Sequence, residues 1–282
     1  MFMKILFFYC IFSITIFAQE KGVSVSLKPS IGLTYTHSSK SQNDRENLEW
    51  LLNLESSLNY ASENFHFDSD LFISFGQIVK DGSIPEKTQD VFILNLMPSI
   101  KLIDTPSLRL FLQSKAETQL KRGYIDDQET QFLDPLFLTH TIFAGEKKYL
   151  IETNEDQELK LTYGIGYSFQ QIIKKHYVLS SENIPKSDAE FINGPSAVFN
   201  LNFSKQLSED VSIGVPLNSL FLMKKDFFKS ISNSRFSSLL LCSLEFRFLS
   251  IQYTNRLVYD KELSNRRQLD QSIVLGLKFT LG

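Results

Sequence analysis

The stretch TYTHSSKS, Thr34 to Ser41, carries a histidine and a serine two residues apart, His37 and Ser39. Residues two apart lie on the same face of a β-strand. A histidine that accepts the proton of a serine hydroxyl turns that hydroxyl into a nucleophile. The pair is therefore either the beginning of a hydrolytic site or the polar end of a strand, and the choice depends on the surface to which the strand belongs.

The elements that must position this pair show a period of two along most of the chain. Apolar residues alternate with polar or small ones at Val23, Val25, Leu27, Ile31, Leu33 and Tyr35, and again at Leu159, Leu161, Tyr163, Ile165, Tyr167 and Phe169. Such alternation is typical of a strand with one apolar face. The pattern is weaker over 196–205, 211–222, 238–248 and 249–259, and it is blurred over 136–151.

The length of these segments favours a membrane over a second packed sheet. About twelve segments reach ten or more residues, which is the length a tilted strand needs to cross a bilayer. Strands of soluble sandwiches are usually about five or six residues long. The sequence therefore predicts strands that span a membrane.

The connections between the segments alternate in length. Short ones such as ASEN (61–64), IDTPS (103–107) and LSED (207–210) follow the even-numbered segments. Long polar ones follow the odd-numbered segments, including HSSKSQNDREN, RGYIDDQETQFLDP and the stretch from Ile172 to Pro195. Outer-membrane barrels have short periplasmic turns and long outer loops. Because an open sheet edge cannot persist in lipid, we predict an all-β fold, a closed antiparallel transmembrane β-barrel of about twelve strands.

The N-terminus has the layout of a secretory signal peptide. Lys4 precedes an apolar run from Ile5 to Phe17, and Ala18 stands at a plausible cleavage point. We therefore predict a signal peptide over residues 1–18, a barrel over residues 19–282 and a location in the bacterial outer membrane. The chain contains 29 basic and 32 acidic residues, a balance that gives no reason to expect nucleic acid as a partner. The expected partners are outer-membrane lipid and the barrel-insertion machinery, and we expect a monomer without a cofactor.

Three stretches resemble a Bacteroidota family of outer-membrane barrels known as a domain of unknown function, number 3078. They are EWLLNLESSLNYASENFHFDSDLFISFG, LRLFLQSKAETQL and YIDDQETQFLDPLFL, the last containing an FL-x-P-x-x-L segment. The resemblance implies the barrel architecture and brings no assigned reaction or ligand.

The His37 and Ser39 pair resembles that of outer-membrane phospholipases and lipid A deacylases, which orient the histidine with a polar residue on the next strand. Here the outward positions of the next segment are Leu48, Trp50 and Leu52, and Glu49 faces inward. We therefore interpret the pair as a polar strand end.

Charged residues gather on the face that the alternation turns inward. The residues expected to line the lumen are Lys28, Glu49, Glu55, Asp68, Asp70, Arg109, Lys115, Glu117, Lys121, Lys160, Glu245, Arg247, Arg256 and Lys278. Their mixed signs fit either a lumen closed by ion pairs or a water-filled one in which Arg109, Lys115 and Lys121 favour anions. A barrel of this size is close to the limit at which side chains block the bore, and we favour the narrow or filled lumen.

No metal site is predicted from the one strip that could suggest it. His66, Asp68 and Asp70 share a face, but positions i to i+4 of a strand span about 13 Å, which is too far to close on one ion.

The sequence leaves three classes of function open. A narrow or plugged pore or transport barrel for a small solute comes first. A non-conducting barrel whose outer loops bind a surface partner is the alternative, and a lipid hydrolase built on His37 and Ser39 is the third.

Overall fold

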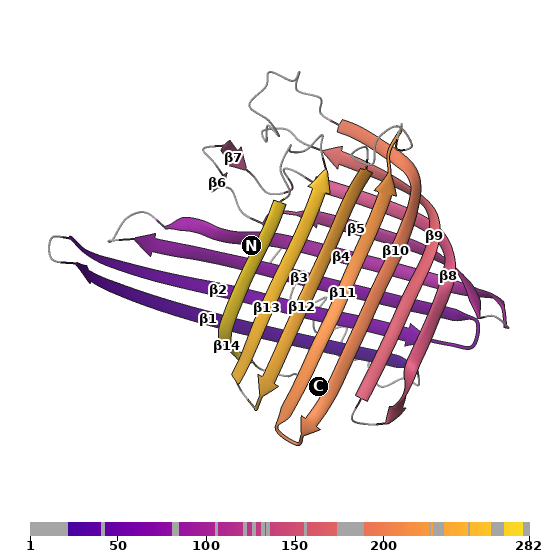
Figure 1. Ribbon diagram of the computed structural model, residues 1–282, viewed down its shortest axis with the longest axis horizontal. Coiled ribbons are helices and arrows are strands. Elements are labelled where there is room, and N and C mark those ends of the chain that lie inside the picture. The colour runs from indigo at the N-terminus through magenta and orange to yellow at the C-terminus, as the bar shows by residue number, and fades with distance from the viewer. Residues whose placement is uncertain are drawn as a thin grey trace, which may run out of the picture.

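The chain folds into a closed ring of twelve antiparallel strands, seen from the side in Figure 1. The computed structural model describes residues 22–40, 43–80, 85–104, 107–120, 123–125, 128–130, 133, 136–154, 157–173, 189–225, 227, 234–247, 249–260 and 268–278. The barrel strands are β1 (Val23–Lys40), β2 (Asn43–Ala61), β3 (Phe65–Lys80), β4 (Glu86–Ile103), β5 (Leu108–Thr118), β8 (Leu136–Asn154), β9 (Gln157–Ile173), β10 (Ala189–Ser208), β11 (Val211–Met223), β12 (Ser234–Phe246), β13 (Leu249–Asp260) and β14 (Gln268–Lys278). Two further strands, β6 (Gly123–Ile125) and β7 (Gln128–Thr130), form a separate hairpin.

The ring runs β1-β14-β13-β12-β11-β10-β9-β8-β5-β4-β3-β2, and each strand pairs with the next in sequence apart from the excursion through β6 and β7. The first and last strands close it, with Ser30 opposite Lys278 and Gly32 opposite Gly276. In Figure 1 the wall built from β10 to β14 crosses in front of the wall built from β1 to β4, and the β1–β2 hairpin projects beyond β14.

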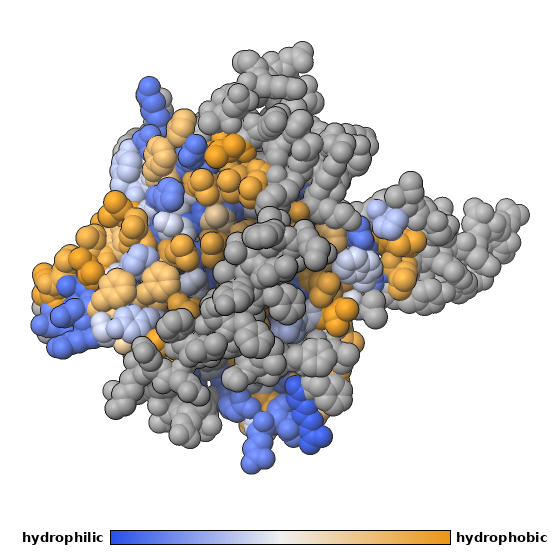
Figure 2. Space-filling view, turned by 180° about the vertical axis from the view of Figure 1, so that it is seen from behind, coloured by the Kyte–Doolittle hydropathy of each residue, from blue (hydrophilic) through white to orange (hydrophobic). Residues whose placement is uncertain are grey.

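The predicted alternation sets which side chains face outward. Apolar residues of one parity are solvent-accessible along the strands, with Ile165 and Ile273 each 76% exposed and Leu275 65% exposed. Residues of the other parity, such as Asn53, Ser74 and Thr141, are buried inside the ring. Figure 2 shows apolar side chains spread over the coloured part of the rear face, with hydrophilic clusters mainly at its ends. The outer surface is therefore an apolar belt.

Polar side chains within this belt bond to one another. Ser114 Oγ and His140 Nδ1 lie 3.0 Å apart on β5 and β8. An unpaired polar group costs free energy in an apolar medium. This contact makes such residues compatible with a lipid-facing position.

The short connections predicted from sequence are turns at one rim. In the turn between β2 and β3, Ser62 N donates to Phe65 O at 2.8 Å, and Phe65 N donates to Ser62 Oγ at 3.2 Å. Strands β10 and β11 are joined through Glu209 and Asp210.

Two predicted long loops were wrong in their bounds, because strand pairing continues further than the apolar pattern. HSSKSQNDREN is largely strand, since β1 reaches Lys40 and β2 begins at Asn43. Both ends of the predicted loop from Ile172 to Pro195 belong to strands, because β9 ends at Ile173 and β10 begins at Ala189. The blurred segment over 136–151 is part of β8.

The closed antiparallel ring, the apolar outer belt and the single rim of short turns are the features of a bacterial outer-membrane barrel. The predicted fold class is confirmed, and so is the outer-membrane type of the barrel. None of the described residues forms a helix long and apolar enough to cross a bilayer. The predicted signal peptide lies outside the described residues.

Replacing Ile165 by lysine tests the apolar belt. Because Ile165 points outward near the middle of β9, Ile165→Lys should lower the free energy of unfolding in a bilayer by about 2–4 kcal/mol. Ser208→Lys, at an exposed strand end beside a turn, is the matched control and should cost no more than about 1 kcal/mol. Urea unfolding of the refolded protein in lipid vesicles, followed by heat-modifiable gel mobility, measures both. Equal effects of the two variants, or a folded mature chain that needs no detergent, would contradict a lipid-facing belt.

Candidate functional site

Apolar side chains from opposite walls meet near the middle of the lumen. Ile93 of β4 packs with Leu239 and Leu241 of β12, and Phe72 of β3 joins them. In a ring of twelve strands, β4 and β12 stand six places apart and therefore face each other across the diameter. All four side chains are buried. Facing walls are therefore bridged here by apolar side chains.

A second apolar cluster fills the lumen nearer the rim of short turns. The rings of Phe111 on β5 and Phe143 on β8 are stacked with centroids 4.5 Å apart. Met97 of β4 and Val198 of β10 complete the cluster. Aromatic residues at inward positions break the polar half of the sequence alternation, and this is why the sequence did not predict an apolar filling.

Charged side chains bridge the lumen towards the long-loop rim. Glu117, the penultimate residue of β5, accepts a hydrogen bond from Arg256 of β13, which is six places away in the ring. Lys115 Nζ lies 3.3 Å from the other oxygen of the same carboxylate. One buried carboxylate thus holds two cations from facing walls.

A second ionic bridge lies towards the short-turn rim. Asp68 of β3 accepts from Lys147 of β8 and from Lys160 of β9, each at 2.9 Å. Asp68 and Lys147 are almost completely buried. Nearby, Arg109 donates to Ser99 Oγ at 3.1 Å and to the carbonyl of Asn64 at 3.2 Å. Burial of these charges is compensated because every one of them has a hydrogen-bonding partner.

Neutral amides cross the lumen between β2 and β13. Asn53 of β2 donates to Gln252 of β13 at 2.9 Å and accepts from Ser74 at 2.6 Å, and Gln252 also donates to Glu55. On the same side of the lumen, Lys28 of β1 pairs with Glu245 of β12 at 3.3 Å.

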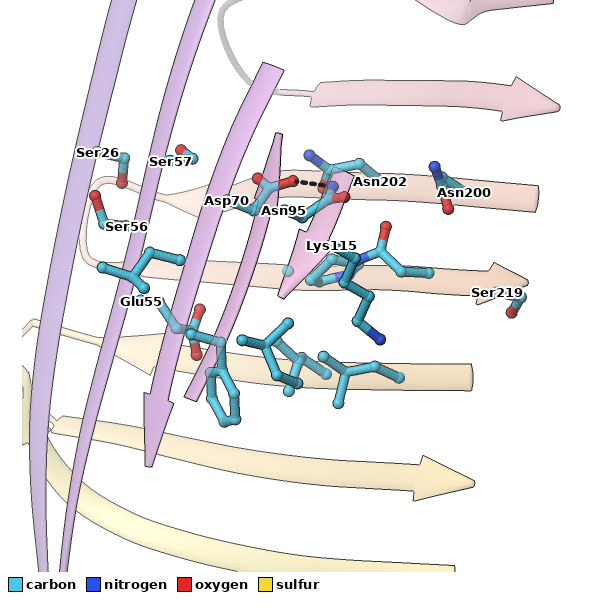
Figure 3. A pocket seen from close by; sticks show the side chains of 18 of the residues that line it. Ser26, Glu55, Ser56, Ser57, Asp70, Asn95, Lys115, Asn200, Asn202 and Ser219 are labelled. Atoms are coloured by element: carbon cyan, nitrogen blue, oxygen red, sulfur yellow. Dashed lines mark hydrogen bonds between the residues drawn. The ribbon is translucent and has the colours of Figure 1, made fainter. Parts of the chain in front are cut away.

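A cavity of about 390 Å³ lies between these contacts. Ten of the twelve barrel strands contribute to its lining, which is rich in amides and hydroxyls from residues such as Asn95, Gln113, Asn200, Asn202 and Thr141. Figure 3 shows Asp70, Asn95 and Lys115 on neighbouring strands of its wall, and Asn200 and Asn202 among the other lining residues. Phe72, Ile93, Leu239 and Leu241 give the cavity an apolar side.

The structure places most of the residues expected to line the lumen at its wall or across it. Those that line the cavity or bridge the lumen are Lys28, Glu55, Asp68, Asp70, Arg109, Lys115, Glu117, Lys160, Glu245 and Arg256. Glu49 has the strand parity of buried Asn53 and is half-buried. Lys121 and the side chain of Lys278 lie outside the described residues.

Arg247 is a correction to the expected lumen lining. It stands in the turn between β12 and β13 with φ 49°, where its guanidinium is largely exposed and lies 3.0 Å from Asp210. The hydrogen bond to Asp210 and its negative charge raise the pKa of Arg247. The apolar pattern assigned this position to a strand because it carries no sign of the turn.

Lys147, Arg235 and Gln252 are lumen contacts that the sequence analysis missed. Arg235 is the second residue of β12, at the long-loop end of the strand, and it donates to Gln170 Oε1 at 2.8 Å. Lys147 stands in the blurred part of β8, between two outward-facing polar residues, Glu146 and Lys148. Lys147 has the same strand parity as the buried residues Thr139, Thr141 and Phe143. This shared parity is the signal that would have predicted an inward position for Lys147.

The backbone pairing also changes the surroundings of the sequence pair in β1. The register sets Glu46 opposite His37 and Asp44 opposite Ser39, because β1 and β2 remain paired up to Lys40 and Asn43. The expectation that only Leu48, Trp50 and Leu52 are available on the next strand was therefore too narrow. The side chains of His37 and Ser39 lie outside the described residues.

Within the described ranges, no group of three or more His, Cys, Asp or Glu side chains could hold a metal ion. His66 and Asp68 share a face as expected, but Asp68 is occupied by the two lysines.

Removing the Asp68 charge tests the ionic bridge towards the short-turn rim. Asp68→Asn leaves Lys147 and Lys160 buried without their counter-ion, and it should lower the free energy of unfolding by about 3–5 kcal/mol. The triple variant Asp68→Leu, Lys147→Met, Lys160→Met removes all three charges and should recover most of that loss. Denaturant unfolding in vesicles measures both. A triple variant less stable than Asp68→Asn would show that the ions themselves stabilise the barrel.

Comparison with known proteins gives distant structural likenesses and one family. An outer-membrane channel from Pseudomonas putida F1 is 10% identical with a TM-score of 0.40, covering 93% of this chain and 96% of that one. The translocator domain of the autotransporter NalP from Neisseria meningitidis is 10% identical with a TM-score of 0.35, covering 95% and 91%. Such likenesses are too remote to carry a functional inference, and a comparison with curated proteins found no match.

Residues 39–124 match the family described as Protein of unknown function (DUF3078), which confirms over that stretch the resemblance stated from the sequence.

Proposed function

We propose that this chain is a narrow, plugged transport barrel of the outer membrane with a polar, charge-lined lumen. The observation that carries the proposal is the contact of Ile93 with Leu239 and Leu241 across the diameter, beside a cavity of about 390 Å³. A water-filled porin keeps its facing walls apart. This lumen instead holds a solute-sized compartment between side chains that must move before anything passes.

The groups that fill the lumen are suited to such movement. The bridge from Arg256 to Glu117 joins two side chains rather than two backbones, so a rotamer change opens it without breaking the sheet. Hydrogen bonds and ion pairs that a solute replaces cost little net free energy to exchange. Passage of a small polar solute is thus a sequence of side-chain exchanges along the polar wall.

The alternative is a non-conducting surface barrel whose outer loops bind a partner. The same packed lumen would serve it, because contacts between facing walls stiffen a barrel that passes nothing. The loop between β9 and β10 that would carry such binding lies outside the described residues, so conductance is the measurement that separates the two functions.

Single-channel recording in planar bilayers tests the proposal. The wild-type protein should give small, infrequent conductance steps because the lumen is closed at Ile93. The double variant Ile93→Ala, Leu239→Ala removes the apolar contact between facing walls and should raise the step size several-fold. Leu112→Ala is the matched control, since Leu112 is exposed on the outer face and its truncation leaves the lumen unchanged.

Heat-modifiable gel mobility of each variant reports whether it is folded. If the double variant fails that check, Leu239→Ala alone takes its place. Absence of current from the wild type and from the widened variant would remove the transport function and leave the surface barrel. Large steps from the wild type would show that the bore is open and not plugged.

A further inference from the structure

Three polar residues form a row across the cavity wall. The register sets Asp70 of β3 opposite Asn95 of β4, and Asn95 opposite Lys115 of β5. Neighbouring strands lie about 4.8 Å apart, so the backbones of Asp70 and Lys115 are about 10 Å apart. A carboxylate and an ammonium group therefore enter the same cavity from the two ends of this row, with Asn95 on the strand between them (Figure 3), and the Lys115 ammonium extends towards Glu117.

The carboxylate of Asp70 has capacity for a further cation. Its hydrogen-bond partner among the described residues is the neutral amide of Asn95, whose Nδ2 lies 3.4 Å from Oδ2. A carboxylate offers about four acceptor positions. The neighbouring Asp68 differs, because its oxygens are already engaged by two lysines. Asp70 is also exposed to the cavity, so a solute can reach it.

Lys115 shares its counter-ion. Glu117 contacts both Lys115 and Arg256, so Lys115 does not have this carboxylate to itself. An ammonium group has three donors and no acceptor. The Lys115 end of the row therefore attracts an anionic group, while the Asp70 end attracts a cationic one.

Other parts of the lining complement these two charges. Asn200 Oδ1 is buried and has no hydrogen-bond partner among the described residues, so it lacks a donor that a ligand would provide. Phe72, Ile93, Leu239 and Leu241 form an apolar surface on the same cavity. A volume of about 390 Å³ lies within the usual range for small-molecule sites.

We propose that the cavity binds a zwitterionic solute the size of a free amino acid with an apolar side chain. Its ammonium group contacts Asp70, its carboxylate contacts Lys115, and its side chain packs on Phe72 and Ile93. The ammonium and carboxylate of an α-amino acid, with a hydrogen bond at each end, span about 8–9 Å, and the backbones that carry Asp70 and Lys115 stand about 10 Å apart. This inference deepens the proposed transport function and rests on it for its biological role, but binding is measurable separately from conductance.

Calorimetric titration of the full chain in detergent tests the site with three probes. They are L-leucine, N-acetyl-L-leucine, which lacks the ammonium group, and L-leucinamide, which lacks the carboxylate. The wild type should bind leucine at least about tenfold more tightly than either derivative, because each derivative loses a charge-assisted contact. This comparison requires no variant, so it stands even if a substitution impairs folding.

Two variants assign the ends of the row. Asp70→Asn should weaken leucine about tenfold or more while leaving N-acetyl-L-leucine nearly unchanged, and Lys115→Gln should weaken leucine equally while leaving L-leucinamide nearly unchanged. The control Asp104→Asn removes an exposed carboxylate at the short-turn rim and should leave all three affinities unchanged.

The outcomes separate this inference from the transport function. Absence of leucine binding, equal binding of all three probes, or variants that do not distinguish the probes would overturn the zwitterion site, whatever the conductance. Leucine binding with the expected pattern but without current from the wild type or the widened variant would keep the site and remove transport.

Discussion

The structure depends on the cost of an unpaired backbone group in lipid. Each N–H or C=O left without a partner in hydrocarbon costs several kcal/mol, so strands that enter a bilayer must close into a ring. Here closure rests on the pairing of β1 with β14, where Ile31 lies opposite Leu277. Everything else follows from closure, because a closed ring has only two faces. One meets lipid and is apolar, and the other is turned inward and must either hold water or fill itself.

The inward face of this barrel carries both apolar and ionic contacts between its walls. Apolar contacts between facing walls exclude water near Ile93, whereas ionic bridges occupy the levels nearer each rim. Buried charges are tolerated because Asp68 and Glu117 each hold two cations. The cavity between these layers is therefore not a packing defect. Its lining of amides, hydroxyls and charges of both signs is what a polar solute would need in place of water.

The alternation of apolar and polar residues was enough to predict the closed fold, its strand number and the parity of inward residues such as Asp70, Lys115 and Glu117. Parity cannot show how far a strand continues beyond its apolar part, and this is why the loop after Ile172 was drawn too long. It also cannot show which inward groups meet. The partnership of Glu117 with Arg256 depends on the ring order, which no local pattern records.

The bridges across the lumen join residues that are far apart in the chain, 139 residues for Glu117 and Arg256 and 199 for Asn53 and Gln252. Contacts of such sequence separation form late, because the intervening chain must first be ordered. Hairpins between consecutive strands assemble earlier, from local turns. The pairing that closes the ring joins Ile31 to Leu277, which are further apart still. Neither the closed wall nor the contacts across the lumen can therefore be complete before the C-terminal strands are in place.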